Sequence, residues 1–452
     1  MGNSTDLATA AKRALIADLL SVEALPASPT QQGLWVLSQL EPSSAAYHVP
    51  VGIRFKGPLR TDVLERSFQA IVARHDSLRT TFELQGALLV QRVSPASSVS
   101  LNVEDLSGIP EAQIEIEAYT RAAQEAARPM DLNRGPLCRA KLFKLRLNEH
   151  VFLCTLHHIV SDAWSAGVLV RELEHNYEMF LKQAGYRPEP LPLQYADFAI
   201  WQREYLQTDI FKRQLAYWKT KLGESTAILN LPLDRSRPAG VSSKGWSQTV
   251  LLDSALVDRL RSIAQDREAT FFILMLAAFK VLLYRYTGQT DIRVGVPVAG
   301  RNQVETEPLI GLFVNTLVLR TDLSGNPTFS AVLAQVRNAM LEALANQDVP
   351  FDKVVEELRP ARSLSHNPVF QVMFATFQAA VRSQPCGDLV ASPYVVIPAT
   401  SRLDLSAALV EGTGGHWWIQ LEYNTLLFDH DSIGRFLGHY VQLLRCVAGI
   451  DS

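Results

Sequence analysis

Two kinds of hydrophobic periodicity alternate along almost the whole chain, and this alternation restricts the possible folds more than any other feature. Residues 48–56 alternate apolar and polar side chains as a strand does, and residues 61–75 repeat apolar side chains every three or four positions as a helix does. Beyond a proline-rich segment at 186–192 the same alternation begins again, at residue 247. We therefore expect an α/β protein with two lobes of similar build.

The expected organisation has three parts. A short amphipathic helical leader occupies residues 1–21, an N-terminal lobe occupies 22–187 and a C-terminal lobe occupies 188–452. The chain has 452 residues, of which 47% are hydrophobic, so each lobe can bury a substantial core. No internal repeat at the spacing of a solenoid or a propeller is visible.

Charge and composition argue against several classes of protein. The chain carries 43 Lys and Arg against 46 Asp and Glu, whereas nucleic-acid binders show a basic excess. Its longest apolar stretch, 271–279, is too short to span a bilayer, and its first residues lack the pattern of a signal peptide. The four cysteines form no CxxC pair, which suits a reducing compartment. We expect a cytoplasmic protein that binds neither nucleic acid nor membrane.

One tract, HHIVSDAWS at 157–165, concentrates residues that can do chemistry. It follows a strongly apolar strand, and neighbouring residues of a strand point to opposite faces, so His157 and His158 should differ in exposure. A partly buried neutral imidazole can accept a proton near pH 7. No GxSxG motif and no cysteine beside a candidate base is present. The tract therefore favours direct attack of one bound substrate on another over a covalent acyl-enzyme.

The same tract has a purely structural interpretation, and the spacing alone leaves both open. The two histidines could be core side chains hydrogen-bonded to the backbone, and Ser161 and Asp162 stand where a helix N-cap belongs. A metal site is less consistent with the sequence, because no third histidine or carboxylate has the spacing of a ligand.

Seven short motifs are spread along the chain. They are SPTQQGLWVLSQLEP (28–42), RHDSLRTTF (74–82), HHIVSDAWS (157–165), YADFAIW (195–201), IGLFVNTLVLR (310–320), NQDVPFDKVVEEL (346–358) and RSLSHNPVFQVMF (362–374). Each motif is weak alone, but together and in this order they make the chain resemble the condensation domains of nonribosomal peptide synthetases, which belong to the chloramphenicol-acetyltransferase-like superfamily. The match runs from about residue 24 to 448.

The resemblance implies two chloramphenicol-acetyltransferase-like lobes arranged as a V-shaped pseudo-dimer with a central tunnel. Carrier proteins would deliver a donor and an acceptor on 4'-phosphopantetheine arms, and the acceptor amine would attack the donor thioester. Mapped onto the family's HHxxxDG, His158 is the catalytic residue and His157 supports it. Asp162 is expected to hold the loop through an ion pair with Arg301, since a buried carboxylate needs such a partner. No metal and no cofactor bound by the chain itself is implied.

The resemblance also points to other residues near the site, which we expect to have structural roles. Arg74, Arg79 and Trp201 match family positions near the site, and we interpret all three as structural rather than catalytic. Asn315 is also expected to be structural. Ala163 stands where the family has glycine. If the backbone there has a negative φ the alanine costs little, whereas a positive φ would cost about 1 kcal/mol or more.

The subtype and the partners stay open at this point. A starter domain would take a fatty-acyl donor from coenzyme A, and an elongation domain would take an aminoacyl or peptidyl donor from a carrier protein. The start at Met1 with a short helix favours a starter domain slightly. A free-standing coenzyme A acyltransferase and a non-catalytic domain that recruits a partner enzyme are the alternatives. The expected partners of this monomer are an acceptor peptidyl carrier protein, a donor carrier protein or acyl-CoA, and neighbouring domains such as adenylation.

Overall fold

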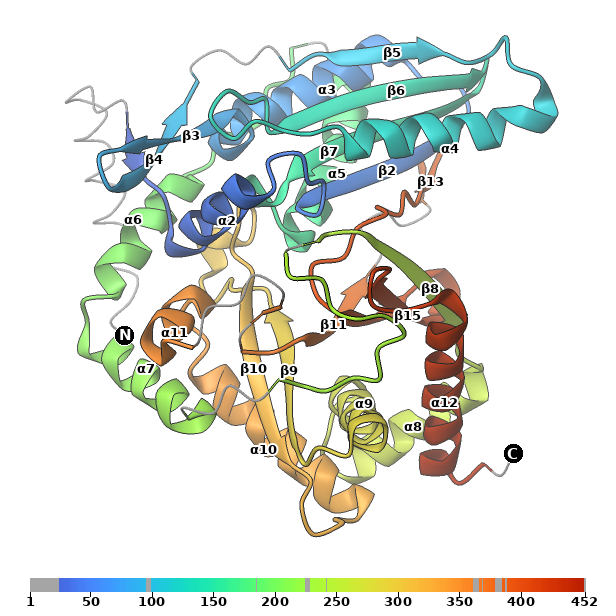
Figure 1. Cartoon of the computed structure of the whole chain (residues 1–452). Helices are drawn as coiled ribbons and strands as arrows, with labels where there is room; N and C mark the ends of the chain where they lie inside the picture. Colours follow the sequence, from blue (N-terminus) through green and yellow to red (C-terminus); the bar gives the residue numbers. More distant parts are fainter. Residues whose placement is uncertain are drawn as a thin grey trace. The chain divides into compact units, whose positions relative to one another are not determined.

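Two six-stranded sheets organise the chain in the computed structural model (Figure 1). The structure describes residues 24–94, 99–183, 185–223, 228–240, 242–360, 366–367, 369–378, 384–386 and 388–450. The expected helical leader at 1–21 lies outside these residues. Each sheet belongs to its own compact unit, so the expectation of two α/β lobes is confirmed.

The two units are interleaved in sequence, whereas a single boundary after residue 187 was expected. The first unit continues to Thr208 and also contains Arg301–Val314 and the segment that carries β12 and β13. In Figure 1 β13 (Leu389–Pro393) runs beside β2 (His48–Lys56), and its residues pair antiparallel with those of β2. Periodicity does not show such returns, because they depend on pairing between segments far apart in the chain.

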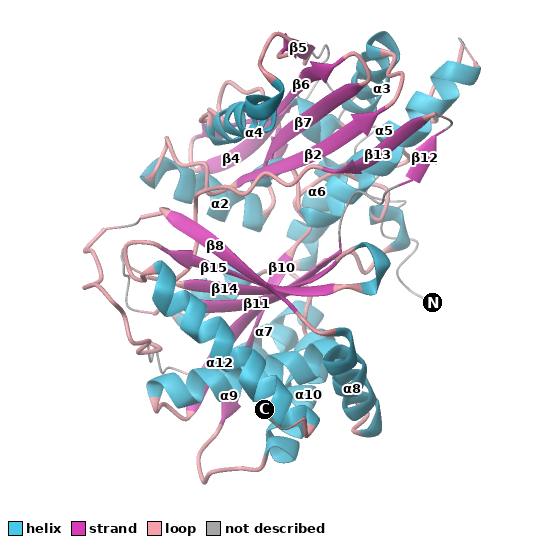
Figure 2. Cartoon of the chain, turned by 90° about the vertical axis from the view of Figure 1, so that its right-hand side faces the viewer, coloured by secondary structure: helices cyan, strands magenta, loops and turns pink. Residues whose placement is uncertain are grey.

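The sheet of the first unit is covered by helices on both faces. Its strands lie in the order β12 (Gln384–Cys386), β13, β2, β7 (Glu149–His157), β6 (Cys138–Arg146) and β5 (Leu101–Asp105). Alternate residues of β7 face opposite ways: Phe152 and Cys154 pack in the core under α3 (Thr61–Arg74) and α5 (Ala163–Lys182), while Val151 and Leu153 pack under α4 (Glu111–Ala127). Figure 2 shows α4 on the other side of the sheet from α3 and α5. Burial on both faces explains why β7 reads as a continuous apolar run.

Smaller elements complete the first unit. They are the three-stranded sheet of β1 (Leu25–Pro26), β4 (Leu88–Val93) and β3 (Thr80–Gln85), the helices α2 (Pro29–Leu40) and α6 (Tyr195–Tyr205), and the 3-10 turns η1 (Asp76–Arg79), η2 (His158–Val160) and η3 (Val304–Thr306).

The sheet of the second unit carries helices on one face. Its strands lie in the order β10 (Asn315–Asp322), β9 (Asp291–Val298), β11 (Val372–Gln378), β14 (Leu405–Glu411), β15 (Trp417–Asn424) and β8 (Gly245–Leu251). The helices α8 (Ser254–Asp266), α9 (Phe271–Thr287), α10 (Phe329–Ala345) and α12 (His430–Ala448) lie along this sheet (Figure 2). The unit also contains α7 (Asp209–Leu222), α11 (Phe351–Leu358) and η4 (Thr413–Gly415).

Residues 254–287 form two helices, α8 and α9, with a bend between them. α8 and α9 meet at an angle of 100°. Glu268 adopts a left-handed φ of 53° between them, and the side chain of Thr270 accepts a hydrogen bond from the N–H of Ile273 to start α9. No single helix among the described residues is long and apolar enough to cross a membrane, and only this bent pair meets that test by length and composition.

Candidate active site

The histidine tract lies where β7 ends and α5 begins, inside the first unit. The N–H of His157 donates to the carbonyl of Leu137 at 2.9 Å, which continues the pairing of β7 with β6. The N–H of His158 donates to the carbonyl of Tyr47 at 2.7 Å, on the side of β2. The strand then tightens into η2. As expected for consecutive residues, His157 is buried and His158 is half-buried.

The hydrogen bond of His158 defines which of its ring nitrogens can accept a proton. Nδ1 lies 2.7 Å from the carbonyl oxygen of Ser161. A carbonyl oxygen only accepts, so Nδ1 carries the hydrogen and donates it. In the neutral ring Nε2 is then the basic nitrogen. The turn at Ser161 thus selects the tautomer that a proton-accepting histidine needs.

His157 has the opposite tautomer and a local role. Its Nδ1 accepts a hydrogen bond from the N–H of Ile159 at 3.1 Å, so its ring hydrogen is on Nε2. The carbonyl of His157 also accepts a bond from the hydroxyl of Ser161 at 3.1 Å. Both contacts stabilise the turn that follows the strand, which agrees with a supporting function for His157.

Asp162 is the N-cap of α5, and its carboxylate links the start of this helix to residues 313–314. Its Oδ1 accepts hydrogen bonds from the N–H and the hydroxyl of Ser165, at 2.8 and 2.7 Å. Its Oδ2 accepts from the backbone N–H groups of Phe313 and Val314, at 3.0 and 3.2 Å. The carboxylate is only 2% exposed, so these donors replace the water that burial has removed. The structural interpretation of Asp162 as a cap is therefore also correct.

The expected ion pair between Asp162 and Arg301 is present. The guanidinium Nη2 of Arg301 lies 3.3 Å from Oδ1 of Asp162 and 3.1 Å from the hydroxyl of Ser165. Its Nη1 donates to the carbonyl of Leu309 at 2.9 Å. Its Cζ lies over the ring of Phe313, 4.0 Å from the ring centroid. Burial lowers the pKa of the Arg301 guanidinium, and the neighbouring carboxylate of Asp162 opposes that effect.

Ser165 is a site residue that was not predicted, although it lies within the tract HHIVSDAWS. Its hydroxyl donates to Asp162 and also lies within hydrogen-bonding distance of the carbonyl and the N–H of Gly311, at 2.9 and 3.1 Å. Gly311 is required there, because an added Cβ would lie 2.1 Å from the ring of Tyr195. Ser165, Gly311 and Tyr195 lie in the third, fifth and fourth motifs. Their membership of these motifs is the sequence signal from which their role in the site could have been predicted.

Two further buried polar side chains brace the same region. The hydroxyl of Tyr195 donates to the carbonyl of Leu312 at 2.8 Å, and burial raises the pKa of this phenol. The amide nitrogen of Gln31 donates to the carbonyl of Ile159 at 3.1 Å, within the histidine turn. Residues of the first and fourth motifs therefore stabilise the region around the third motif, HHIVSDAWS.

The three residues interpreted as structural make structural contacts. Arg74 pairs with Glu172 and donates to the carbonyl of Glu189 at 2.8 Å. Arg79 pairs with Asp76 and donates to the carbonyls of Val72 and Ser94. Trp201 stacks on Tyr205, with ring centroids 5.6 Å apart, and packs beside Phe198.

Ala163 causes no backbone strain. It is the first residue of α5, and among the described residues other than glycine a positive φ occurs only at Glu268, Asn326 and Arg359. Its side chain is exposed. Of the two possibilities for this departure from HHxxxDG, the inexpensive one therefore holds.

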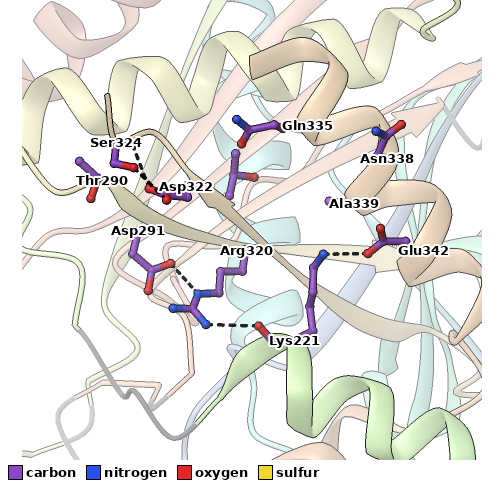
Figure 3. A pocket seen from close by; sticks show the side chains of 11 residues that line it. Lys221, Thr290, Asp291, Arg320, Asp322, Ser324, Gln335, Asn338, Ala339 and Glu342 are labelled. Carbon is purple, nitrogen blue, oxygen red and sulfur yellow. Dashed lines mark hydrogen bonds and ion pairs between the residues drawn. The ribbon is translucent and has the colours of Figure 1, made fainter. Parts of the chain in front are cut away.

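A separate polar cavity lies in the second unit, where β9 begins and its antiparallel neighbour β10 ends (Figure 3). Its volume is about 620 Å³. Lys221 pairs with Glu342 at 2.7 Å and Arg320 pairs with Asp291 at 2.9 Å across its wall. The charged side chains of the cavity wall are thus largely paired with one another. Among the described residues, no group of three or more His, Cys, Asp or Glu is arranged to hold a metal ion.

Comparison with known proteins identifies relatives of the whole described fold. Residues 22–449 match the family model of the condensation domain. Linear gramicidin synthase subunits C and B of Brevibacillus parabrevis are 46% and 45% identical to this chain over 94% of its length. The chain spans only 6% and 8% of those two proteins.

Solved structures give the same result. The X-domain from teicoplanin biosynthesis is 31% identical, with a TM-score of 0.85 over 94% of this chain and 95% of that one. A starter condensation domain of rhizomide synthetase, solved as a mutant with C8-CoA, has a TM-score of 0.82 over 96% of both chains. It is 20% identical, so this likeness concerns the fold alone.

Proposed function

This chain belongs to the condensation-domain family, and on that premise we propose that it forms an amide bond between an amine acceptor and an acyl thioester donor. The amine nitrogen attacks the thioester carbonyl carbon, the carbon–sulfur bond breaks, and the acyl group ends on the acceptor nitrogen. The amine loses one proton, and the departing thiolate gains one, so the step needs no other reactant.

His158 is the residue proposed to act on the amine. The observation that carries this assignment is the bond from its Nδ1 to the carbonyl of Ser161 at 2.7 Å, because that bond leaves Nε2 as the basic nitrogen. Nε2 accepts the amine proton, or orients the amine during attack, and the proton passes on to the leaving sulfur. The ion pair of Asp162 with Arg301 keeps the turn in place.

We propose that both substrates arrive on carrier proteins. The relatives that support this are synthase subunits at 45–46% identity, of which this chain corresponds to a small part. A starter domain with a fatty-acyl donor is the alternative to this proposal. The likeness to a starter domain supports the fold only.

The test follows the mass of an aminoacyl-loaded acceptor carrier protein. One reaction offers an aminoacyl or peptidyl carrier donor and the other a fatty-acyl coenzyme A. Each is run with the wild type, with His158→Ala and with His439→Ala, a control at an exposed histidine of α12. We expect transfer from the carrier donor that falls at least about 100-fold in His158→Ala and is unchanged in His439→Ala. Equal rates in all three proteins would remove His158 from the chemistry.

A non-catalytic platform is the second candidate, because the X-domain from teicoplanin biosynthesis is 32% identical over 94% of this chain in its complex with OxyB. The intact His158 and Asp162 favour catalysis over this candidate. Absence of product from both donors, with carriers shown to be loaded, would favour the platform instead. Transfer from coenzyme A alone would make the chain a starter domain.

A further inference from the structure

A second buried histidine lies beside the candidate active site. His48 is the first residue of β2 and stands directly opposite His157 in the antiparallel register. The two imidazole rings meet edge to face, with centroids 5.8 Å apart and planes at 70°. Both side chains are only 4% exposed. The contact lies within the first unit, at the point where β7 gives way to the turn that carries His158.

The surroundings of His48 keep it neutral with one tautomer. Its Nδ1 lies 2.7 Å from the carbonyl oxygen of Ala126, in the last turn of α4, so Nδ1 carries the hydrogen. Its Nε2 is buried with no hydrogen-bond partner among the residues that the structure describes. A proton on Nε2 would place an unpaired charge there, near Arg139. Burial accordingly lowers the pKa of His48.

The residue before His48 holds the backbone of His158. The carbonyl of Tyr47 accepts the N–H of His158 at 2.7 Å, which is a short bond for a backbone pair. The position of this carbonyl depends on where β2 begins. That start is held by the bond from His48 to Ala126, because the buried face of α4 packs on the sheet.

We propose that His48 is a positioning residue for the condensation reaction. Its Nδ1–H anchors the start of β2 to the end of α4, and so places the Tyr47 carbonyl that holds His158, while its ring supports His157. The proposal rests on the function proposed above for His158. It assigns to β2 a part in the site that the histidine tract alone does not provide.

The chemistry of the anchor predicts which substitutions are tolerated. Phenylalanine at position 48 would keep the ring but leave the Ala126 carbonyl without its donor. Asparagine would keep a donor to the Ala126 carbonyl, because its Nδ2 reaches about where Nδ1 of histidine lies. We therefore expect His48→Phe to disturb the site and His48→Asn to restore it.

A matched control separates positioning from general stability. His150 lies on β7, in the same sheet, and is also 4% exposed, but it stands opposite Phe55 and away from the turn. His150→Phe therefore loses a buried imidazole of the same sheet without touching the anchor. A purely structural role for His48 predicts that the two phenylalanine variants behave alike.

The experiment has a kinetic arm and a spectroscopic arm. In the kinetic arm we expect His48→Phe to lower kcat about 10-fold with KM within about twofold, and His48→Asn and His150→Phe to keep kcat within about twofold. In the spectroscopic arm, nitrogen chemical shifts of labelled histidines report the tautomer of His158. We expect a change of that tautomer ratio in His48→Phe alone.

The two arms distinguish this proposal from the proposed function. If the wild type forms no amide, the proposed function fails while the tautomer of His158 still reports whether His48 positions it. The positioning proposal is overturned if His48→Phe leaves the His158 signals unchanged, or if His150→Phe changes them equally. It is also overturned if His48→Asn fails to restore kcat in a protein that unfolds at the wild-type temperature.

Discussion

The carboxylate of Asp162 and the guanidinium of Arg301 lie 3.3 Å apart although 139 residues separate them in the chain. Arg301 begins the segment that returns to the first unit, and Asp162 begins α5 directly after the histidine turn. The pair therefore joins the returning segment to the turn. Because both side chains are almost fully buried, each charge depends on the other for compensation.

Breaking this pair from one side should be strongly destabilising. Asp162→Ala leaves the Arg301 guanidinium buried without its counter-charge and removes the cap of α5, so we expect a loss of about 3–5 kcal/mol in the free energy of unfolding. Urea unfolding followed by circular dichroism measures it. Glu178→Ala, which breaks an exposed pair with Lys182, is the control and should change little. Similar losses in both variants would contradict this account of the pair.

Much of the candidate site could be predicted from local sequence. The apolar run before His157 predicted the buried strand, and the position of Asp162 before a helical pattern predicted its cap. The pairing with Arg301 came only from the resemblance to a family. Local periodicity contains no information about a partner so distant in the chain.

The rest of the fold depended on contacts that no local pattern records. The break between α8 and α9 occurs at Glu268, which adopts a left-handed conformation. Glutamate rarely adopts this conformation, so the residue type does not predict the break. Ser165 and Tyr195 looked like ordinary helix residues, and their importance comes from carbonyls of the returning segment. A motif shows that such residues recur together, but it does not show which atoms they contact.

Ala163→Gly tests whether the departure from HHxxxDG affects activity. Because Ala163 is exposed and begins a helix, the substitution relieves no strain, and glycine lowers helix stability by up to about 1 kcal/mol. We expect kcat for amide formation to stay within about twofold of the wild type. A gain of about 10-fold or more would show instead that the methyl group obstructs a substrate.

Lys280 in α9 is a fully buried lysine in the second unit. Its Nζ donates to the carbonyl of Leu319 at 2.6 Å and to the hydroxyl of Thr321 at 2.9 Å, and it lies 3.3 Å from the carbonyl of Ile292. Burial lowers the pKa of Lys280 from 10.5 to about 7, while Asp291 acts in the opposite direction. A neutral amine can also be satisfied there, since the Thr321 hydroxyl can reverse and donate to it.

This pKa shift predicts a dependence of stability on pH. Between about pH 7 and 10.5 the unfolded chain binds more protons at Lys280 than the folded chain, so folding becomes more favourable as the pH rises through that window. Lys280→Met removes the group. The stability of the wild type relative to this variant should rise by up to about 1.4 kcal/mol per pH unit between pH 7.5 and 9.5. Lys212→Met, at an exposed lysine, should give parallel curves, and parallel curves for Lys280→Met would disprove the shift.

We expect the side-chain amide of Asn315 to stabilise the second unit through its hydrogen bonds. Its Nδ2 donates to the carbonyls of Gln347 and Val349 at 2.9 and 2.7 Å, and its Oδ1 accepts the N–H groups of Thr316 and Phe351 at 2.9 Å each. One side chain thus fixes the start of β10 to the segment before α11, the sixth motif.

Two substitutions separate the amide from its volume. Asn315→Ala leaves two carbonyls and two N–H groups without the amide, and we expect a loss of about 1–3 kcal/mol in the free energy of unfolding. Asn315→Asp keeps the volume but turns an acceptor oxygen towards two acceptor carbonyls, so it should be less stable than Asn315→Ala at pH 7. Urea unfolding measures both, with Asn338→Ala on the exposed face of α10 as the control. If Asn315→Asp is as stable as the wild type, the two carbonyls do not depend on the amide.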